Sequence, residues 1–85
     1  MFSMYVLKSK KDGKLYFGYT SDLKKRLKEH NSGKVLSTKS RAPFKLVYLE
    51  GYASAYDAKK REHNLKLGAR AWRQLMIRIK RSTAS

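Results

Sequence analysis

The fold is decided by residues 3–20, which read SMYVLKSKKDGKLYFGYT. Segments 3–9 and 15–20 are rich in β-branched and aromatic side chains, which is typical of β-strands. Residues 10–14 between them contain an Asp-Gly pair, which is typical of a tight turn joining two paired strands. This stretch therefore predicts a β-hairpin.

Side chains on a strand alternate between the two faces of the sheet. Tyr5 is therefore expected on one face with Met4 and Val6 on the other, and Tyr16 is expected to share a face with Gly18. The hairpin can thus present two tyrosines side by side. Gly18 has no side chain, and a glycine inside a strand often marks the close approach of another backbone or a ligand.

A helix is predicted to follow the hairpin and to end near Asn31. Ser21 or Asp22 suits its N-cap, because a short side-chain oxygen can accept a bond from a free N–H of the first turn. Ser32-Gly33 suits its end, because glycine tolerates the backbone conformation that closes many helices.

Two stripes run along this predicted helix. Leu23 and Leu27 lie four residues apart and are expected to face the core. Arg26 and His30 are also four residues apart, three positions beyond each leucine, so they form a second stripe beside the buried one.

Residues 34–43 are polar and basic and are predicted to form a loop. Residues 44–52 alternate in the manner of a third strand, which places Phe44, Leu46 and Tyr48 on one face.

A second helix is predicted between Ser54, as N-cap, and Gly68. One row of this helix contains Ala55, Ala58, Glu62 and Leu65. A carboxylate in an apolar row is costly to bury unless it is paired or binds a metal. The position of Glu62 therefore needs an explanation, which could be a bound metal or an ion pair with Lys59 or Lys66 on the same helix.

A last helix is predicted over residues 69–80, with a core-facing stripe of Trp72, Leu75, Met76 and Ile79. The predicted fold class is thus an α/β domain of the α+β kind. A three-stranded antiparallel sheet is flanked by helices in the order β-β-α-β-α-α.

The composition fits one small domain, predicted over residues 1–81 and followed by a frayed tail at 82–85. The chain has 85 residues, no cysteine and two histidines, which excludes disulfides and a thiolate zinc site. No apolar run is long enough for a membrane span, so a soluble, cytoplasmic protein is expected. The 21 basic residues exceed the 6 acidic ones and give a net charge of +15, which favours a polyanionic partner such as nucleic acid.

The order of the unusual residues resembles the GIY-YIG nuclease superfamily over roughly residues 3–80. Ser3-Met4-Tyr5 and Tyr16-Phe17-Gly18 stand where the two triplets of that family fall, followed by Arg26, His30 and Glu62. The segment LYFGYTSDL is most similar to the small single-domain bacterial branch related to the N-terminal nuclease domain of UvrC. The segment REHNLK resembles the helix that carries the metal-binding glutamate of the family. The first triplet keeps only its tyrosine, and a phenylalanine replaces the middle residue of the second.

The resemblance implies a role for each of five residues. Glu62 would bind one Mg²⁺ or Mn²⁺, and Arg26 would stabilise charge on the phosphate. Tyr5 would act as general base, directly or through water, with Tyr16 orienting it or the phosphate and His30 assisting proton transfer. Because a tyrosine of ordinary pKa is a poor base at neutral pH, we expect neighbouring positive charge to favour the Tyr5 phenolate.

The predicted function is metal-dependent hydrolysis of DNA phosphodiester bonds, with structure-directed cleavage in repair or recombination as its biological setting. Gly18, Asn64 and Gln74 are further candidates for contact with the substrate. One alternative is a nucleic-acid-binding module that keeps the fold without useful turnover. Another is a basic component of a ribonucleoprotein, with RNA as partner and no dependence on Glu62.

Overall fold

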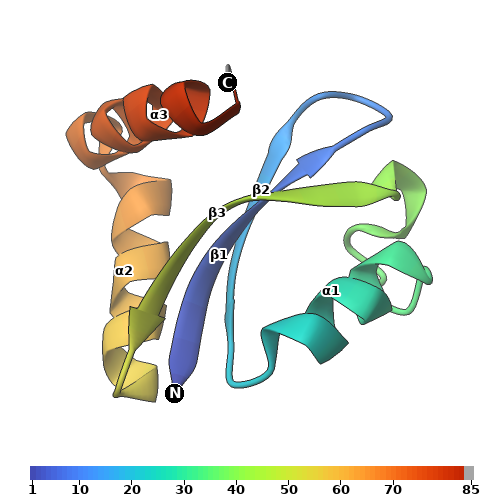
Figure 1. Ribbon diagram of the computed structural model, residues 1–85, viewed down its shortest axis with the longest axis horizontal. Helices are drawn as coiled ribbons and strands as arrows, with labels where there is room; N and C mark the ends of the chain where they lie inside the picture. The colour runs from blue at the N-terminus through green and yellow to red at the C-terminus, as the bar shows by residue number, and fades with distance from the viewer. Residues whose placement is uncertain (84–85) are drawn as a thin grey trace.

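The computed structural model describes residues 1–83, and its elements follow the predicted order (Figure 1). In these residues three strands form one antiparallel sheet in the order β2-β1-β3. The strands are β1 (Phe2–Ser9), β2 (Leu15–Thr20) and β3 (Phe44–Tyr52). The helices are α1 (Leu23–Asn31), α2 (Ala55–Leu67) and α3 (Ala69–Thr83), with a short 3₁₀ helix η1 (Lys39–Arg41) inside the segment predicted to be a loop. The chain is thus an α+β domain.

The predicted hairpin is confirmed. The Ser9 N–H donates to the Lys14 carbonyl at 2.9 Å, and Gly13 closes the turn with a φ of 72°. The Ser9 hydroxyl also accepts the N–H groups of Lys11 and Asp12, each at 3.1 Å. The turn therefore sets the register that places Tyr5 opposite Gly18.

Each face of the sheet carries its own core cluster, and helices cover both faces (Figure 1). The cluster toward α2 and α3 consists of Met4, Val6, Phe17, Val47, Leu65, Leu75 and Ile79. The cluster toward α1 consists of Tyr5, Leu7 and Phe44, with Leu23 and Leu27 packed against it. The predicted separation of Tyr5 from Met4 and Val6 is therefore confirmed.

The prediction that Phe44, Leu46 and Tyr48 share one face of β3 is wrong for Tyr48. Leu46 pairs with Leu7, but the next pair along the ladder is Tyr48 with Val6, so Val47 is an extra residue in β3. Such a β-bulge reverses the alternation beyond it. Tyr48 consequently packs against the cluster that faces α2 and α3.

The helix ends follow the predicted caps. The Asp22 side chain accepts the Lys25 N–H at 3.1 Å at the start of α1. The Ser54 hydroxyl accepts the Asp57 N–H at 3.4 Å at the start of α2, and the Gly68 N–H donates to the Asn64 carbonyl at its end.

Helix α3 runs to Thr83, three residues beyond the predicted end at Lys80. Of its predicted stripe, Leu75 and Ile79 are buried and Met76 is partly buried, whereas the Trp72 side chain lies outside the described part of the structure. Residues 82 and 83 of the predicted tail belong to this helix, and residues 84–85 are outside the description. None of the described helices is long and apolar enough to cross a membrane.

Candidate active site

Tyr5 lies on the central strand β1 and is 1% exposed. Its neighbour across the ladder is Gly18 on the edge strand β2, and a Cβ atom at position 18 would lie 2.5 Å from Tyr5 Cζ. The sequence predicts the close approach of another backbone or a ligand at Gly18, but the approaching group is the side chain of Tyr5 on the neighbouring strand. Because residue 18 is glycine, the Tyr5 ring and hydroxyl can lie directly against β2.

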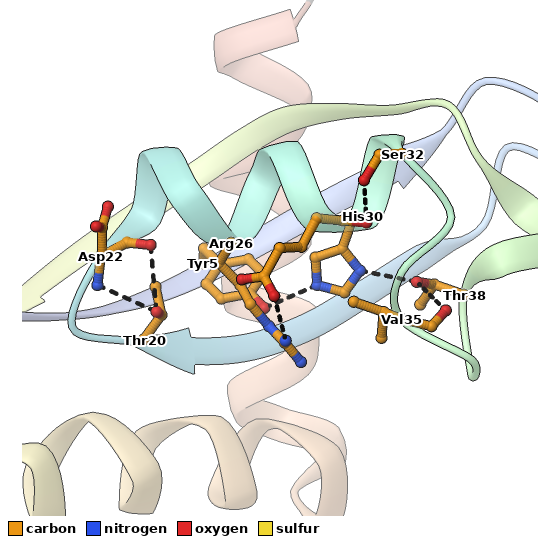
Figure 2. Close-up of polar contacts among 9 residues, drawn as sticks. Tyr5, Thr20, Asp22, Arg26, His30, Ser32, Val35 and Thr38 are labelled. Carbon is orange, nitrogen blue, oxygen red and sulfur yellow. Dashed lines mark hydrogen bonds and ion pairs between the residues drawn. The ribbon is translucent and has the colours of Figure 1, made fainter.

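His30, in the last turn of α1, is fully buried against this tyrosine. Its Nε2 lies 3.0 Å from the Tyr5 hydroxyl, and its Nδ1 lies 2.8 Å from Thr38 Oγ1 (Figure 2). The imidazole therefore links the strand tyrosine to the loop between α1 and β3. A histidine at the end of a helix can simply interact with the helix dipole. His30 instead contacts specific side chains through both of its ring nitrogens.

Tyr16 completes an aromatic group around the histidine. Its ring centroid lies 6.5 Å from that of Tyr5 and 4.9 Å from that of His30, with an edge-on angle of 62° to the imidazole. The two tyrosines are thus neighbours, as the strand alternation predicts. In the contacts described, Tyr16 meets the histidine through its ring.

Arg26 approaches the Tyr5 hydroxyl from the middle of α1, and in Figure 2 the side chains of Tyr5, Arg26 and His30 converge beneath that helix. The Arg26 side chain is 35% exposed, and one of its terminal nitrogens lies 4.0 Å from Glu29 Oε2. Arg26 also lines an open surface pocket of about 610 Å³ at the start of α1, together with Tyr19, Thr20, Ser21, Asp22, Lys25 and Glu29. Of Tyr5, Arg26 and His30, only Arg26 lines this pocket.

The electrostatics correct one expectation about Tyr5. Burial is the largest influence and raises the pKa of Tyr5, while the hydrogen bond and charge of Arg26 lower it by less. Burial, assisted by the charge of Arg26, lowers the pKa of His30, so the imidazole is neutral at neutral pH and supplies no positive charge. The site thus holds a neutral phenol beside a neutral imidazole, rather than a phenolate among cations.

Glu62 lies in the buried row of α2, as predicted, and is 9% exposed. Its Oε1 forms an ion pair with Lys66, one of the two lysines expected as alternative partners. The carboxylate borders a pocket of about 320 Å³ with Tyr56, Lys59, Lys60 and His63, and its charge raises the pKa of Tyr5. Glu62 is therefore electrostatically coupled to Tyr5 from the helix on the other face of the sheet.

A metal site here would rest on very few protein ligands. Among the described residues, no three His, Cys, Asp or Glu side chains gather as metal ligands. A single carboxylate oxygen suits a hard ion such as Mg²⁺, which commonly keeps several waters and takes its remaining ligands from substrate phosphates. The residues present therefore fit an ion that is bound weakly until the substrate arrives.

The remaining predicted residues are separate from this cluster. Asn64 and Gln74 are exposed, and no described hydrogen bond or ion pair joins either to Tyr5, Arg26 or His30. Conversely, Thr38 could not be singled out from sequence, because it lies in a polar loop without periodicity. It is fully buried against His30.

Comparison with known proteins agrees with this geometry. Residues 1–74 match the model of the GIY-YIG catalytic domain. The chain is 48% identical over 64 residues to a UPF0213 protein of Streptococcus pneumoniae, covering 74% of this chain and 64% of that protein. It is 40% identical over 80 residues to the UPF0213 protein YazA of Bacillus subtilis, covering 93% of this chain and 80% of that protein.

A solved structure supports the fold. The solution NMR structure of the UPF0213 protein BH0048 from Bacillus halodurans is similar with a TM-score of 0.56 and 35% identity. The similarity covers 94% of this chain and 86% of that one. The matching domain model, the identity to these relatives and the shared fold together establish that the chain belongs to the GIY-YIG catalytic domain family.

Proposed function

We propose that the protein is a divalent-metal-dependent endonuclease that hydrolyses phosphodiester bonds in DNA. The observation that carries this proposal is the hydrogen bond between the Tyr5 hydroxyl and Nε2 of a buried, neutral His30, with Arg26 beside the same hydroxyl. A neutral imidazole can accept a proton, and arginine can bind a phosphate through two parallel hydrogen bonds. Proton transfer and phosphate binding therefore meet at one point.

In the proposed reaction Tyr5 passes a proton rather than storing negative charge. As a water molecule attacks phosphorus, its proton moves to the Tyr5 oxygen while the Tyr5 proton moves to His30 Nε2. One P–O bond forms to the water oxygen, and the bond to the leaving sugar oxygen breaks, that oxygen taking a proton from solvent. His30 then returns its proton to the Tyr5 oxygen, and the Tyr5 hydroxyl releases a proton to solvent. This path avoids a free phenolate, which the raised pKa of Tyr5 disfavours.

Arg26 is the first residue of the cluster that a substrate would meet. Its side chain is 35% exposed, whereas Tyr5 is 1% exposed. Contact with phosphate would draw the guanidinium toward the pocket and open the way to the Tyr5 hydroxyl. The bound phosphate would also offset the positive charge that develops on His30.

Glu62 would hold the metal ion. The ion would supply Lewis-acid stabilisation of phosphate charge when bound. Lys66, which pairs with Glu62, is about half exposed. Its side chain could therefore turn toward solvent when the carboxylate binds the metal. The partner is proposed to be DNA, with RNA as the alternative, because the net charge of +15 suits either polyanion.

The direct test is a cleavage assay on duplex, single-stranded and branched DNA and on RNA, with Mg²⁺, Mn²⁺ or a chelator. The key variant is Tyr5→Phe, which removes one oxygen and the hydrogen bond to His30. Tyr52→Phe is the matched control, because it also removes one hydroxyl and its hydrogen bond, here to Glu50 on β3. We expect metal-dependent cleavage of DNA that Tyr5→Phe slows by about 100-fold or more and that Tyr52→Phe leaves within a few fold.

Two results would contradict the proposal. Tight nucleic-acid binding by the wild type without cleavage under any metal would favour the binding module, which the charge supports equally well. Equal cleavage by the wild type and Tyr5→Phe would remove Tyr5 from the reaction. Preference for the branched substrate would support a role in repair or recombination. Preference for RNA would show that RNA, and not DNA, is the substrate.

A further inference from the structure

Thr38 is a fully buried polar residue that the proposed reaction does not yet use. Its Oγ1 lies 2.8 Å from His30 Nδ1 and 3.4 Å from the Val35 carbonyl oxygen (Figure 2). The Tyr5 hydroxyl lies 3.0 Å from the other imidazole nitrogen. Four groups thus form one chain, from the tyrosine through the histidine and the threonine to a backbone carbonyl.

The loop that carries Thr38 is fixed on both sides. The Thr38 N–H donates to the Val35 carbonyl at 3.1 Å, and the Arg41 N–H donates to the Thr38 carbonyl at 2.9 Å. At the loop's ends, the Asn31 side chain accepts the Phe44 N–H at 2.6 Å and donates to the Phe44 carbonyl at 3.3 Å. The threonine hydroxyl is therefore held at the imidazole by a closed loop.

The direction of the hydrogen bonds follows from counting protons. A neutral imidazole has one N–H, so one nitrogen donates and the other accepts. Arg26 beside this hydroxyl has only donors, so it cannot accept the Tyr5 proton. If His30 Nε2–H also donated to that oxygen, the Tyr5 proton would have no acceptor among the described contacts. If Nε2 accepts instead, the Tyr5 proton is satisfied and His30 Nδ1–H donates to Thr38.

The threonine is then satisfied as well, because its hydroxyl proton can point to the Val35 carbonyl, although that contact is long at 3.4 Å. In this arrangement every proton of the chain has an acceptor. Buried polar groups in folded proteins are nearly always hydrogen-bonded, so this arrangement is favoured.

We propose that Thr38 is a positioning residue that holds His30 in the Nδ1–H tautomer, leaving Nε2 to accept the proton of Tyr5. The proposal rests on the proposed nuclease function for its catalytic consequence, but the tautomer is a property of the resting protein. Thr38 touches neither substrate nor the reacting oxygen, and it acts only through His30.

The test is ¹⁵N NMR of the imidazole nitrogens in the full chain, with Thr38→Val and Thr38→Ser as the variants. Valine keeps the shape and removes the acceptor for Nδ1–H, whereas serine keeps the hydroxyl. The second histidine, His63, is exposed and provides a reference in the same spectrum, identified with His63→Gln. We expect an Nδ1–H tautomer for His30 in the wild type and Thr38→Ser, and a shift toward Nε2–H in Thr38→Val.

Cleavage is measured on the same samples. Thr38→Val is expected to slow cleavage by about 100-fold, with Thr38→Ser restoring most of the rate. An Nε2–H tautomer in the wild type, or an unchanged tautomer in Thr38→Val with a native amide spectrum, overturns the proposal. So does a shifted tautomer without loss of rate. If the wild type cleaves nothing, the nuclease function fails, but the spectra still decide the tautomer.

Discussion

The two most deeply buried carboxylates of this protein differ in how their oxygens are used. Glu50 on β3 accepts hydrogen bonds from the Tyr48 and Tyr52 hydroxyls at 2.7 Å each and forms an ion pair with Arg61 at 2.9 Å. Glu62 on α2 has a half-exposed lysine as partner for Oε1, and no partner for its other oxygen among the side chains that the structure describes. Of these two carboxylates, Glu62 is therefore the one with a lone pair left for a ligand.

At Glu62 we predict that Glu62→Gln abolishes metal-dependent cleavage while leaving DNA affinity unchanged or slightly higher. The substitution removes the proposed metal ligand and one negative charge near phosphate, with almost no change in volume. The measurements are single-turnover cleavage in Mg²⁺ or Mn²⁺ and equilibrium DNA binding without metal.

Glu50→Gln is the control, because both oxygens of the Glu50 carboxylate already accept hydrogen bonds from Arg61. It is expected to lower the free energy of unfolding while keeping metal-dependent cleavage. Wild-type cleavage by Glu62→Gln, or the same loss in both variants, would remove Glu62 as the metal ligand.

Among the elements, the β1–β2 hairpin sets the geometry of the site through the Tyr5–Gly18 pair. A glycine inside a strand usually costs stability, because the unfolded chain is freer. Here its missing side chain is required, since a Cβ would overlap the phenol that reaches His30. The hairpin therefore links the stability of the sheet to the placement of the Tyr5 hydroxyl.

We predict that Gly18→Ala lowers the free energy of unfolding by about 1–3 kcal/mol, the usual cost of overpacking, and also displaces Tyr5 from His30. Urea unfolding and the imidazole NMR signals measure the two effects. Gly51→Ala on β3 is the control, because a Cβ there meets only the flexible Met1 side chain, at 3.1 Å from its sulfur. A Gly18→Ala protein as stable as the Gly51→Ala protein would contradict this account.

The elements also separate what the sequence could predict from what it could not. The hairpin, both helix caps and the burial of Glu62 depend on local spacing, and these predictions are confirmed. The bulge at Val47 depends on how β3 packs on β1, and η1 and the buried Thr38 depend on a closed loop. The neutral state of the site was also not predicted, because burial of Tyr5 and His30 outweighs the charge of Arg26.

Over the whole molecule, the six acidic residues are all used by the fold or by the candidate site. Asp22 caps α1 and Asp57 lies in the first turn of α2, while the other four form ion pairs, namely Asp12, Glu29, Glu50 and Glu62. Because the 21 basic residues outnumber these six, a net charge of +15 remains. The charge is spread along the chain rather than placed on one base-reading helix.

We therefore predict DNA binding that is electrostatic and only weakly selective for sequence. If about 4 to 7 phosphates are neutralised, the logarithm of the affinity should fall against the logarithm of salt with a slope of roughly −4 to −6. The measurement is a salt titration on several random duplexes and one branched junction. A shallow slope, or one duplex preferred by more than about 1000-fold, would contradict the prediction.

The close packing of Tyr5 on Gly18 also has a consequence for evolution. The two positions behave as one steric unit, so natural variation at them should be correlated even though they lie on different strands. A relative with any side chain at the position of Gly18 should carry a residue smaller than tyrosine at the position of Tyr5. Relatives in which both residues are replaced would lack the Tyr5 hydroxyl. We expect such relatives to bind nucleic acid without hydrolysing it.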